Sequence, residues 1–560
     1  MAAKDLRNRF EHGYCRQMHR PSGPQKARLI RMTIKPHQTD SCLPRFSSAY
    51  TGRSSQICDC ENPLNPSRSE KLNTYILLAL IAVATLFVHG YHPYVEDAEI
   101  YLPGIERMLN PTLFPVGQEW FQSHANMTLF PNLVAMSLRV THLPFEAGLL
   151  LWHLASIFML LLACWDLSGL CFPSKRARWG SVALVAGLLS IPVAGTALYI
   201  MDQYLNPRNL AAFAGMFAVA RTLESKYVRA LLWLVAAACV HPLMWTYPFS
   251  FCVLLVVMKR LESRLWPALK RAEVQSGVAC LLPLTIPLTQ STPAYHEAAK
   301  LHAYHYIQHW AWYELLGLVA PIALFFWFAK IARAKGWTHT LRLCRAFIVY
   351  DVIYIVAALA VDLRERFESL ARLQPLRSLH LLYMVMFVMI GGLLGEFVLK
   401  NRVSRWVVLF VPLGVGMHMA ERAVFPASAT VEWPGRAPRN PWAQAFVWVR
   451  QNTPVDAVFA MDPNYMHIDG EDEIGFRCLA ERSRLADAIK DNGVVSMFPP
   501  LADRWLNEVT AQTPWSKLGV EDFARLKRDY GANWLILQQP GVPGLECPYK
   551  NSAVRVCRVP

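Results

Sequence analysis

The chain has 560 residues, of which 54% are hydrophobic and only 17% are charged, and its formal net charge is +15. So small a charged fraction is untypical of soluble domains, in which about a quarter of the residues are charged. The positive charge does not indicate a nucleic-acid partner, because Lys and Arg gather at the ends of apolar segments, as membrane topology requires. Composition therefore predicts an integral membrane protein that binds no nucleic acid.

Residues 1–70 are basic and polar without a sustained hydrophobic period, so we expect a disordered cytoplasmic tail. A transmembrane domain is predicted over 71–420, where apolar runs long enough to span a bilayer follow one another. The crossings, about eleven in number, are expected at 74–90, 146–165, 180–200, 208–222, 229–241, 243–259, 274–290, 313–330, 346–362, 378–398 and 405–420. Two half-helices that turn at His241-Pro242 fit better than one kinked helix, because proline removes a helical hydrogen bond.

The distribution of basic residues predicts the orientation. The loops expected on one side, such as 330–345, hold most of the Lys and Arg, whereas the first loop on the other side, 91–145, holds few. Because basic loops stay in the cytoplasm, the N-terminus is expected inside and the C-terminal domain outside, in the periplasm of a bacterium.

Residues 421–560 are expected to form a small extracytoplasmic α/β domain, with helices at 442–451 and 520–530 and strands at 457–461 and 534–537. Cys547 and Cys557 lie in this domain and could pair in an oxidising compartment, which would leave Cys478 over, so the pairing stays open. The acidic run Asp469–Glu473 lacks the spacing of a calcium loop and is interpreted as a solvated loop.

Two adjacent acids, Glu96 and Asp97, directly follow the first predicted crossing. Carboxylates at the mouth of a membrane helix can serve as a general base or as metal ligands. The alternative is solvated charge at the interface. No residue is assigned to a metal and no cofactor is predicted, although a divalent metal ion stays an alternative.

Two arginines are candidates for contact with an anionic ligand. Arg208 lies at the outer end of the fourth predicted crossing and Arg377 at the start of the tenth. A planar guanidinium can hold two phosphate oxygens at once, which makes both residues candidate substrate ligands. The alternative for each is an arginine that extends from the interface to water.

Histidines supply the remaining candidates. His241 lies in an apolar run, where an imidazole needs a partner, and it would either bind substrate or cap the broken helix. His302, His305 and His309 are spaced so that they could share a helical face. With neighbouring Tyr and Trp residues they could form an interfacial belt, contact substrate (His305 and His309) or bind a metal.

Several segments resemble those of the GT-C superfamily of membrane glycosyltransferases, and more narrowly a poorly characterised group of bacterial membrane proteins with GT-C-like topology. The similar segments are EDAEIYLPGIERMLNPTLFP, NPRNLAAFAGMFAVA, HPLMW, HYIQHW, LQPLRSL and GFRCLAERS, within residues 75–540, whereas 486–490 departs from the expected pattern. The resemblance implies a polytopic α-helical fold and transfer of a sugar from a polyprenyl-phosphate or polyprenyl-diphosphate donor. It also implies Asp97 as base or metal ligand, with Glu96 beside it.

The partners implied are a lipid-linked sugar donor, membrane lipids and an acceptor that the sequence does not name. No nucleotide-binding fingerprint is present, which agrees with a lipid-linked donor. The alternatives are a transporter or lipid flippase, or a membrane scaffold without catalysis. Acids in the middle of a predicted helix would favour transport, but Asp166, Asp351 and Glu396 are expected near helix ends.

Overall fold

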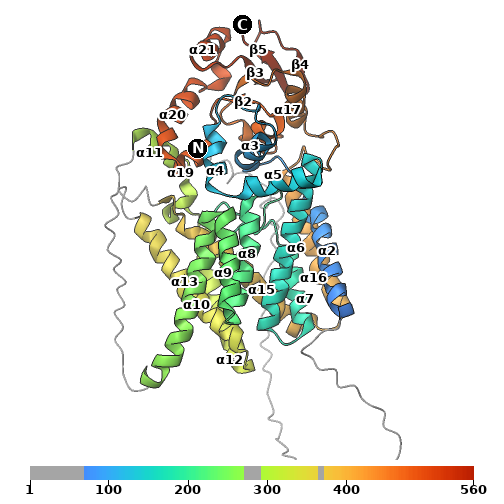
Figure 1. Ribbon diagram of the computed structural model, residues 1–560, viewed down its shortest axis with the longest axis vertical. Helices are drawn as coiled ribbons and strands as arrows, with labels where there is room; N and C mark the ends of the chain where they lie inside the picture. Colours follow the sequence, from blue (N-terminus) through green and yellow to red (C-terminus); the bar gives the residue numbers. More distant parts are fainter. Residues whose placement is uncertain (1–67, 270–291, 363–370) are drawn as a thin grey trace, which may run out of the picture.

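The computed structural model describes residues 68–269, 292–362 and 371–560, so residues 1–67 of the predicted tail and the crossing at 274–290 lie outside the described residues, whereas residues 68–70 of that tail are helical. The described chain forms a helical bundle with a small α/β domain above it (Figure 1). Among these residues, seven helical segments are long and apolar enough to cross a membrane. They are α2 (Arg68–His89), α6 (Phe145–Cys171), α10 (Pro242–Leu269), α12 (Trp312–Lys335), α13 (Thr338–Asp362), α15 (Leu379–Leu393), which is preceded by η5 (Pro375–Ser378) and continued by the π-helical η6 (Leu394–Leu399), and α16 (Val403–Val424).

Three shorter helices complete the described bundle: α7 (Lys175–Gly187), α8 (Pro207–Leu223) and α9 (Tyr227–Val240). The predicted crossing at 180–200 is wrong in its second half, because the helix ends at Gly187 and residues 188–206 form an irregular segment. The break at His241-Pro242 is where it was predicted, although α10 runs well beyond residue 259. The described chain thus supports a polytopic helical fold without reproducing the count of eleven.

Helices α7 and α15 pack closely in the bundle because glycines face each other. A Cβ on Gly180 would stand 2.3 Å from the carbonyl oxygen of Gly391. In a membrane no hydrophobic effect drives helices together, so their association depends on close van der Waals packing. Small residues such as glycine allow this close approach. Helix α7, held by this contact, leads directly into the irregular segment 188–206.

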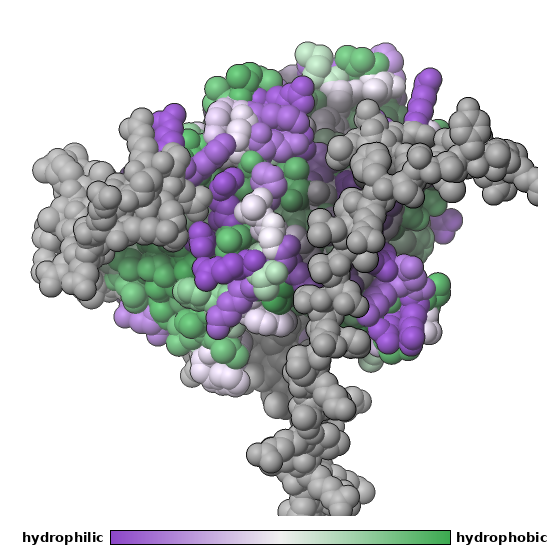
Figure 2. Space-filling view, turned by 90° about the horizontal axis from the view of Figure 1, so that it is seen from below, coloured by the Kyte–Doolittle hydropathy of each residue, from purple (hydrophilic) through white to green (hydrophobic). Residues whose placement is uncertain are grey.

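The end of the bundle away from the α/β domain is strongly basic. Seen from below, hydrophilic residues gather over this end beside hydrophobic ones (Figure 2). The exposed cations near the helix ends here are Lys175, Lys226, Arg229, Lys330, Arg333, Lys335, Lys400 and Arg402. Their grouping agrees with the loop bias that predicted a cytoplasmic location for this end.

Short helices lie between the bundle and the α/β domain. From the first outer loop come α3 (Ala98–Leu109), α4 (Glu119–Met127) and α5 (Phe130–Thr141), and from the later chain come α11 (Pro293–Lys300), η2 (Ala303–His305) and η3 (Ile307–His309). Figure 1 shows α3 directly beneath the sheet and α5 across the top of the bundle. The first outer loop therefore forms the junction between the two parts.

The α/β domain contains a five-stranded sheet in the order β2-β1-β3-β5-β4. Strand β1 (Val458–Met461) pairs in parallel with β2 (Ser483–Arg484) and β3 (Trp534–Gln538), and β5 (Val554–Arg558) pairs antiparallel with β3 and β4 (Tyr549–Lys550). The surrounding helices are α17 (Pro441–Asn452), η7 (Tyr465–His467), α18 (Phe476–Ala480), α19 (Asp491–Met497), η8 (Pro499–Leu501), α20 (Ala502–Ala511), η9 (Trp515–Lys517) and α21 (Val520–Tyr530). All four elements predicted for this domain are present.

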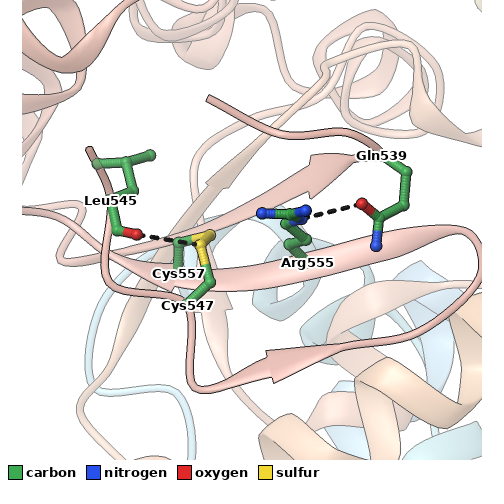
Figure 3. Close-up of a disulfide and its surroundings, with 5 residues drawn as sticks. All are labelled: Gln539, Leu545, Cys547, Arg555 and Cys557. Carbon is green, nitrogen blue, oxygen red and sulfur yellow. Dashed lines mark hydrogen bonds between the residues drawn. A yellow bond between two sulfur atoms is a disulfide. The ribbon is translucent and has the colours of Figure 1, made fainter. Parts of the chain in front are cut away.

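A disulfide joins Cys547 to Cys557 of β5, so the pairing that the sequence left open is made (Figure 3). Arg555, on the same strand, donates a hydrogen bond from Nε to Gln539 Oε1 at 2.9 Å. Cys478 is a free, buried thiol. Because disulfides persist in oxidising compartments, the pair agrees with a domain outside the cytoplasm.

Candidate functional site

Asp97 lies immediately before α3, at the junction of the bundle and the α/β domain. Its Oδ2 accepts a hydrogen bond from Arg208 Nη2 at 3.4 Å, and its Oδ1 accepts one from Lys490 Nζ at 3.3 Å. Its backbone N–H donates to the hydroxyl of Tyr204 at 3.1 Å, which fixes the main chain. The side chain is 27% exposed, so a carboxylate between two cations remains open to a ligand.

Arg208 is held in place by the segment that precedes α8. The side chain of Asn206 caps the helix by accepting from Arg208 N at 2.9 Å. Asp202 then accepts from Nε and Nη2 of Arg208 at 3.0 and 2.8 Å, a bidentate pair that fixes the guanidinium plane. Asp202 was not among the residues predicted for the site, because it fell in the short loop between the predicted crossings 180–200 and 208–222 and no local pattern links it to Arg208.

Lys490 comes from the α/β domain, just before α19, and its ammonium group donates to both Glu96 and Asp97. Glu96 has φ of +57°, a backbone region that residues other than glycine rarely adopt. Its N–H donates to the carbonyl of Glu473 at 2.9 Å, which helps to hold this conformation. Lys490 lies in the stretch 486–490, which differs from the pattern expected from the resemblance. The sequence therefore gave no positive indication that Lys490 belongs to the site.

The charges at the site stabilise one another. Burial by itself raises the pKa of the Asp97 carboxyl, but Lys490, Arg208 and Arg377 outweigh it and bring the pKa below its ordinary value. Burial lowers the pKa of the Lys490 ammonium, and Glu96, Asp97 and Glu473 raise it above its ordinary value. Both groups are therefore ionised near neutral pH, Asp97 as a carboxylate and Lys490 as a cation.

Arg377 is on η5, and its positive charge acts on Asp97 and on His241. Its Nε is buried without a hydrogen-bond partner, and no ion pair is formed by it within the described chain. His241 accepts a hydrogen bond at Nδ1 from Met244 N at 3.4 Å and so caps α10, which was one of its two predicted roles. The structure thus brings Asp97, Arg208, His241 and Arg377 to one region.

The predicted helical face of His302, His305 and His309 is wrong, because this segment forms two short 3₁₀ turns. His302 and His305 are buried with their ring centroids 5.1 Å apart. His309 is exposed, and its ring lies 6.2 Å from that of Tyr306. Of His305 and His309, the two predicted substrate ligands of this segment, only His305 is buried, and it lies beside His302.

A buried ion network fastens the α/β domain to α3. Glu99 accepts from the backbone N–H of Arg477 at 2.7 Å, from its Nη1 at 3.3 Å and from Arg484 Nε at 3.0 Å. Arg477 also makes a bidentate pair with Asp491 at 3.0 and 2.8 Å, and Arg484 pairs with Asp487. Asp491, which is part of this network, directly follows Lys490 in the chain. Glu99 therefore helps to position Lys490 through Arg477 and Asp491.

The interpretation of Asp469–Glu473 as a solvated loop is wrong for its central residues. Glu471 and Asp472 are buried, and Asp472 accepts from the backbone N–H groups of Ala427 and Ser428 at 2.9 and 2.7 Å. Burial raises the pKa of the Glu471 carboxyl well above its ordinary value, with Glu473 and Asp472 adding to the effect. The end of the run contacts the first outer loop, where Glu96 N donates to the carbonyl of Glu473, which its composition did not indicate.

The described residues contain no preformed metal site: no group of three or more His, Cys, Asp or Glu side chains is arranged to hold an ion. Glu96 and Asp97 instead share the ammonium group of Lys490. These two adjacent carboxylates are thus bridged by a cation of the chain itself.

No family model matches this chain, and no curated protein matches it. Two similar solved structures are the crystal structure of the Archaeoglobus fulgidus oligosaccharyltransferase in the apo form and archaeal oligosaccharyltransferase AglB from the same organism in complex with an inhibitory peptide and a dolichol-phosphate. In each case the sequence identity is 10%, the TM-score is 0.42, and the match covers 84% of this chain and 70% of the other.

Proposed function

We propose that this protein is a membrane glycosyltransferase that moves a sugar from a polyprenyl-phosphate-linked donor to an acceptor hydroxyl at the outer face of the bacterial inner membrane. The observation that carries the proposal is the Asp97 carboxylate, held between Arg208 and Lys490 where the bundle meets the α/β domain. A negative group that can take a proton and positive groups that can hold a phosphate are the two requirements of this reaction.

In the proposed step the acceptor oxygen forms a bond to the anomeric carbon of the sugar while the bond from that carbon to the phosphate oxygen breaks. The electron pair of the broken bond stays on the lipid phosphate, which leaves. The acceptor proton passes to the Asp97 carboxylate, which is ionised and ready to receive it near neutral pH. The acidity of the hydroxyl rises as its oxygen bonds to carbon, so a carboxylate of low pKa suffices late in the step.

Arg377 is the group that we assign to the leaving phosphate. Arg208 and Lys490 are each paired with two carboxylates, whereas Arg377 has no ion-pair partner in the described ranges and has a buried, unsatisfied Nε. An uncompensated cation in such a position is stabilised by binding an anion. Its place at the start of the span Pro375–Leu399 suits a phosphate at the level of lipid headgroups.

The outer location is supported by two separate features. Exposed cations cover the opposite end of the bundle, and the α/β domain carries the Cys547–Cys557 disulfide. Basic ends remain in the cytoplasm and disulfides form outside it. Lipid-linked sugars at that face, and not cytoplasmic nucleotide sugars, are therefore the proposed donors.

The pH profile tests the role of Lys490. Because Lys490 lowers the pKa of Asp97, Lys490→Gln should raise this pKa and move the acidic limb of the kcat/KM profile to higher pH. In the unmodified protein, transfer should persist at pH values below the ordinary pKa of an aspartate, because Asp97 stays ionised there and can still accept the proton. Measuring transfer by both proteins over a range of acidic pH values checks this. An unmoved acidic limb would show that Asp97 is not the titrating base.

The transporter alternative is favoured by one observation. Asp351, expected near a helix end, instead lies well inside α13, and this expectation is wrong because the helix begins at Thr338. Its carboxyl group is buried, and neither oxygen has a hydrogen-bond partner within residues 68–269, 292–362 and 371–560. Carboxyl groups buried in membrane helices often mark ion or proton paths.

Asp351→Asn separates the two functions. For a transferase it should change the transfer rate less than about threefold, because Asp351 lies outside the Asp97 cluster. For a proton- or ion-coupled transporter it should remove coupled transport, and Asp97→Asn should then matter less than Asp351→Asn. Parallel assays of sugar transfer and of transport into proteoliposomes, with both variants, decide between the functions.

A further inference from the structure

Next to the Asp97 cluster is a second group of buried polar atoms that lack partners. His302, His305 and Asn492 are each more than nine-tenths buried. Among the residues that the structure describes, none forms a hydrogen bond with His302 Nε2, His305 Nε2 or Asn492 Oδ1. Buried polar atoms are nearly always satisfied, so a group left open in one place indicates that something else binds there.

The geometry places this group between the bundle loop and the α/β domain. The rings of His302 and Tyr304 lie 5.4 Å apart, and those of Tyr304 and His305 lie 4.5 Å apart. A Cβ on Gly493 would stand 3.9 Å from His302 Nε2, which brings α19 and the residue after Asn492 against the histidine. Helix α19, which also carries Asn492, thus packs against the His302 segment, although the two are far apart in sequence.

This group is contiguous with the proposed catalytic site. Arg377 acts electrostatically on His302 and His305 as well as on Asp97, and Tyr304 is influenced by both Arg377 and Asp97. Lys490, which contacts Asp97, is only two residues before Asn492. A ligand whose phosphate meets Arg377 would therefore extend toward either Asp97 or the histidines.

The chemistry of the open atoms favours a neutral, hydroxyl-rich ligand. Burial, together with the charge of Arg377, lowers the pKa of His302 to about 4, and burial likewise lowers the pKa of His305, so both rings are neutral near pH 7. A neutral imidazole nitrogen either donates or accepts according to its tautomer, and an amide oxygen accepts. Sugar hydroxyls both donate and accept, and the ring of Tyr304 offers an apolar face for a sugar ring.

We infer that His302, His305 and Asn492, with the ring of Tyr304, form the subsite that binds the sugar of the lipid-linked donor. This inference rests on the proposed function, because it identifies the part of the donor that lies beyond the phosphate. It makes the α/β domain a contributor to sugar selection through Asn492, in addition to presenting Lys490.

Lipid binding tests the inference without requiring transfer. The full chain in nanodiscs is titrated with polyprenyl phosphate and with the same lipid phosphate linked to glucose, galactose, mannose or arabinose. At least one sugar-bearing lipid should bind about tenfold more tightly than the bare lipid phosphate, as a few hydrogen bonds to hydroxyls allow. His302→Phe and Asn492→Leu, which keep volume but remove the polar atoms, should abolish this difference and change binding of the bare lipid less than about twofold.

Glu297→Ala on α11 is the matched control, because Glu297 is half-exposed on the helix that precedes the same loop. It should leave both affinities unchanged. If His302→Phe or Asn492→Leu fails to insert into membranes or has an altered thermal unfolding transition, His305→Phe is tested in its place. If no sugar improves binding, or if the variants still prefer the sugar-bearing lipid, the proposed sugar subsite is wrong. The proposed binding of the lipid phosphate is not affected by that result. If the unmodified protein binds none of these lipids, the proposed function itself fails and the subsite falls with it.

Discussion

Replacing Asp97 with asparagine is expected to lower kcat for sugar transfer by about a thousandfold, the scale associated with losing a general base. Asparagine keeps the size of the side chain but cannot take the acceptor proton. Folding should survive, because Arg208 retains its bidentate pair with Asp202 and Lys490 retains Glu96. The measurement is transfer from labelled polyprenyl-phosphate sugars by purified protein, together with the amount of protein inserted in membranes.

The control for this variant is Asp503→Asn, which removes an exposed carboxylate on α20. It should leave transfer and insertion unchanged. Asp97→Asn protein that is well inserted and retains most of its activity would contradict the assigned role. A site of that kind would fit a membrane scaffold better than an enzyme.

Arg477→Met should weaken the attachment of the α/β domain by about 3–5 kcal/mol, the cost of breaking a buried ion pair. The Arg477 side chain is only 2% exposed and is paired with both Glu99 and Asp491. Its loss leaves these carboxylates buried with fewer positive partners, at the contact that joins α3 to the α/β domain. Lys490 would lose its support, so transfer should fall along with stability.

Thermal unfolding and limited proteolysis of the junction measure this effect. The control is Arg525→Ala on α21, which breaks the more exposed pair with Asp522 and should cost less than about 1 kcal/mol. An Arg477→Met protein as stable as the unmodified one would show that the domain is held mainly by apolar packing. Loss of activity without loss of stability would instead indicate that Arg477 acts only by positioning Lys490.

Local patterns predicted much of the fold because each depends on neighbours in sequence. The first crossing and the break at His241-Pro242 follow from apolar length and from the chemistry of proline, and both are present. Strand β1 and helix α21 were likewise predicted from short runs of side chains. The irregular part at 188–200 was predicted to be helical because its apolar composition resembles that of a membrane helix, whereas its turns depend on tertiary contacts.

The sequence by itself determined that the chain is built from apolar helices with an α/β domain after them, and that two acids follow the first helix. Only the tertiary structure decided what surrounds those acids. Lys490 and Glu96 are separated by 394 positions, and Arg477 and Glu99 by 378. Hydrophobic periodicity acts over a few residues, whereas the partner of a buried charge is chosen by which distant surfaces pack together and exclude water.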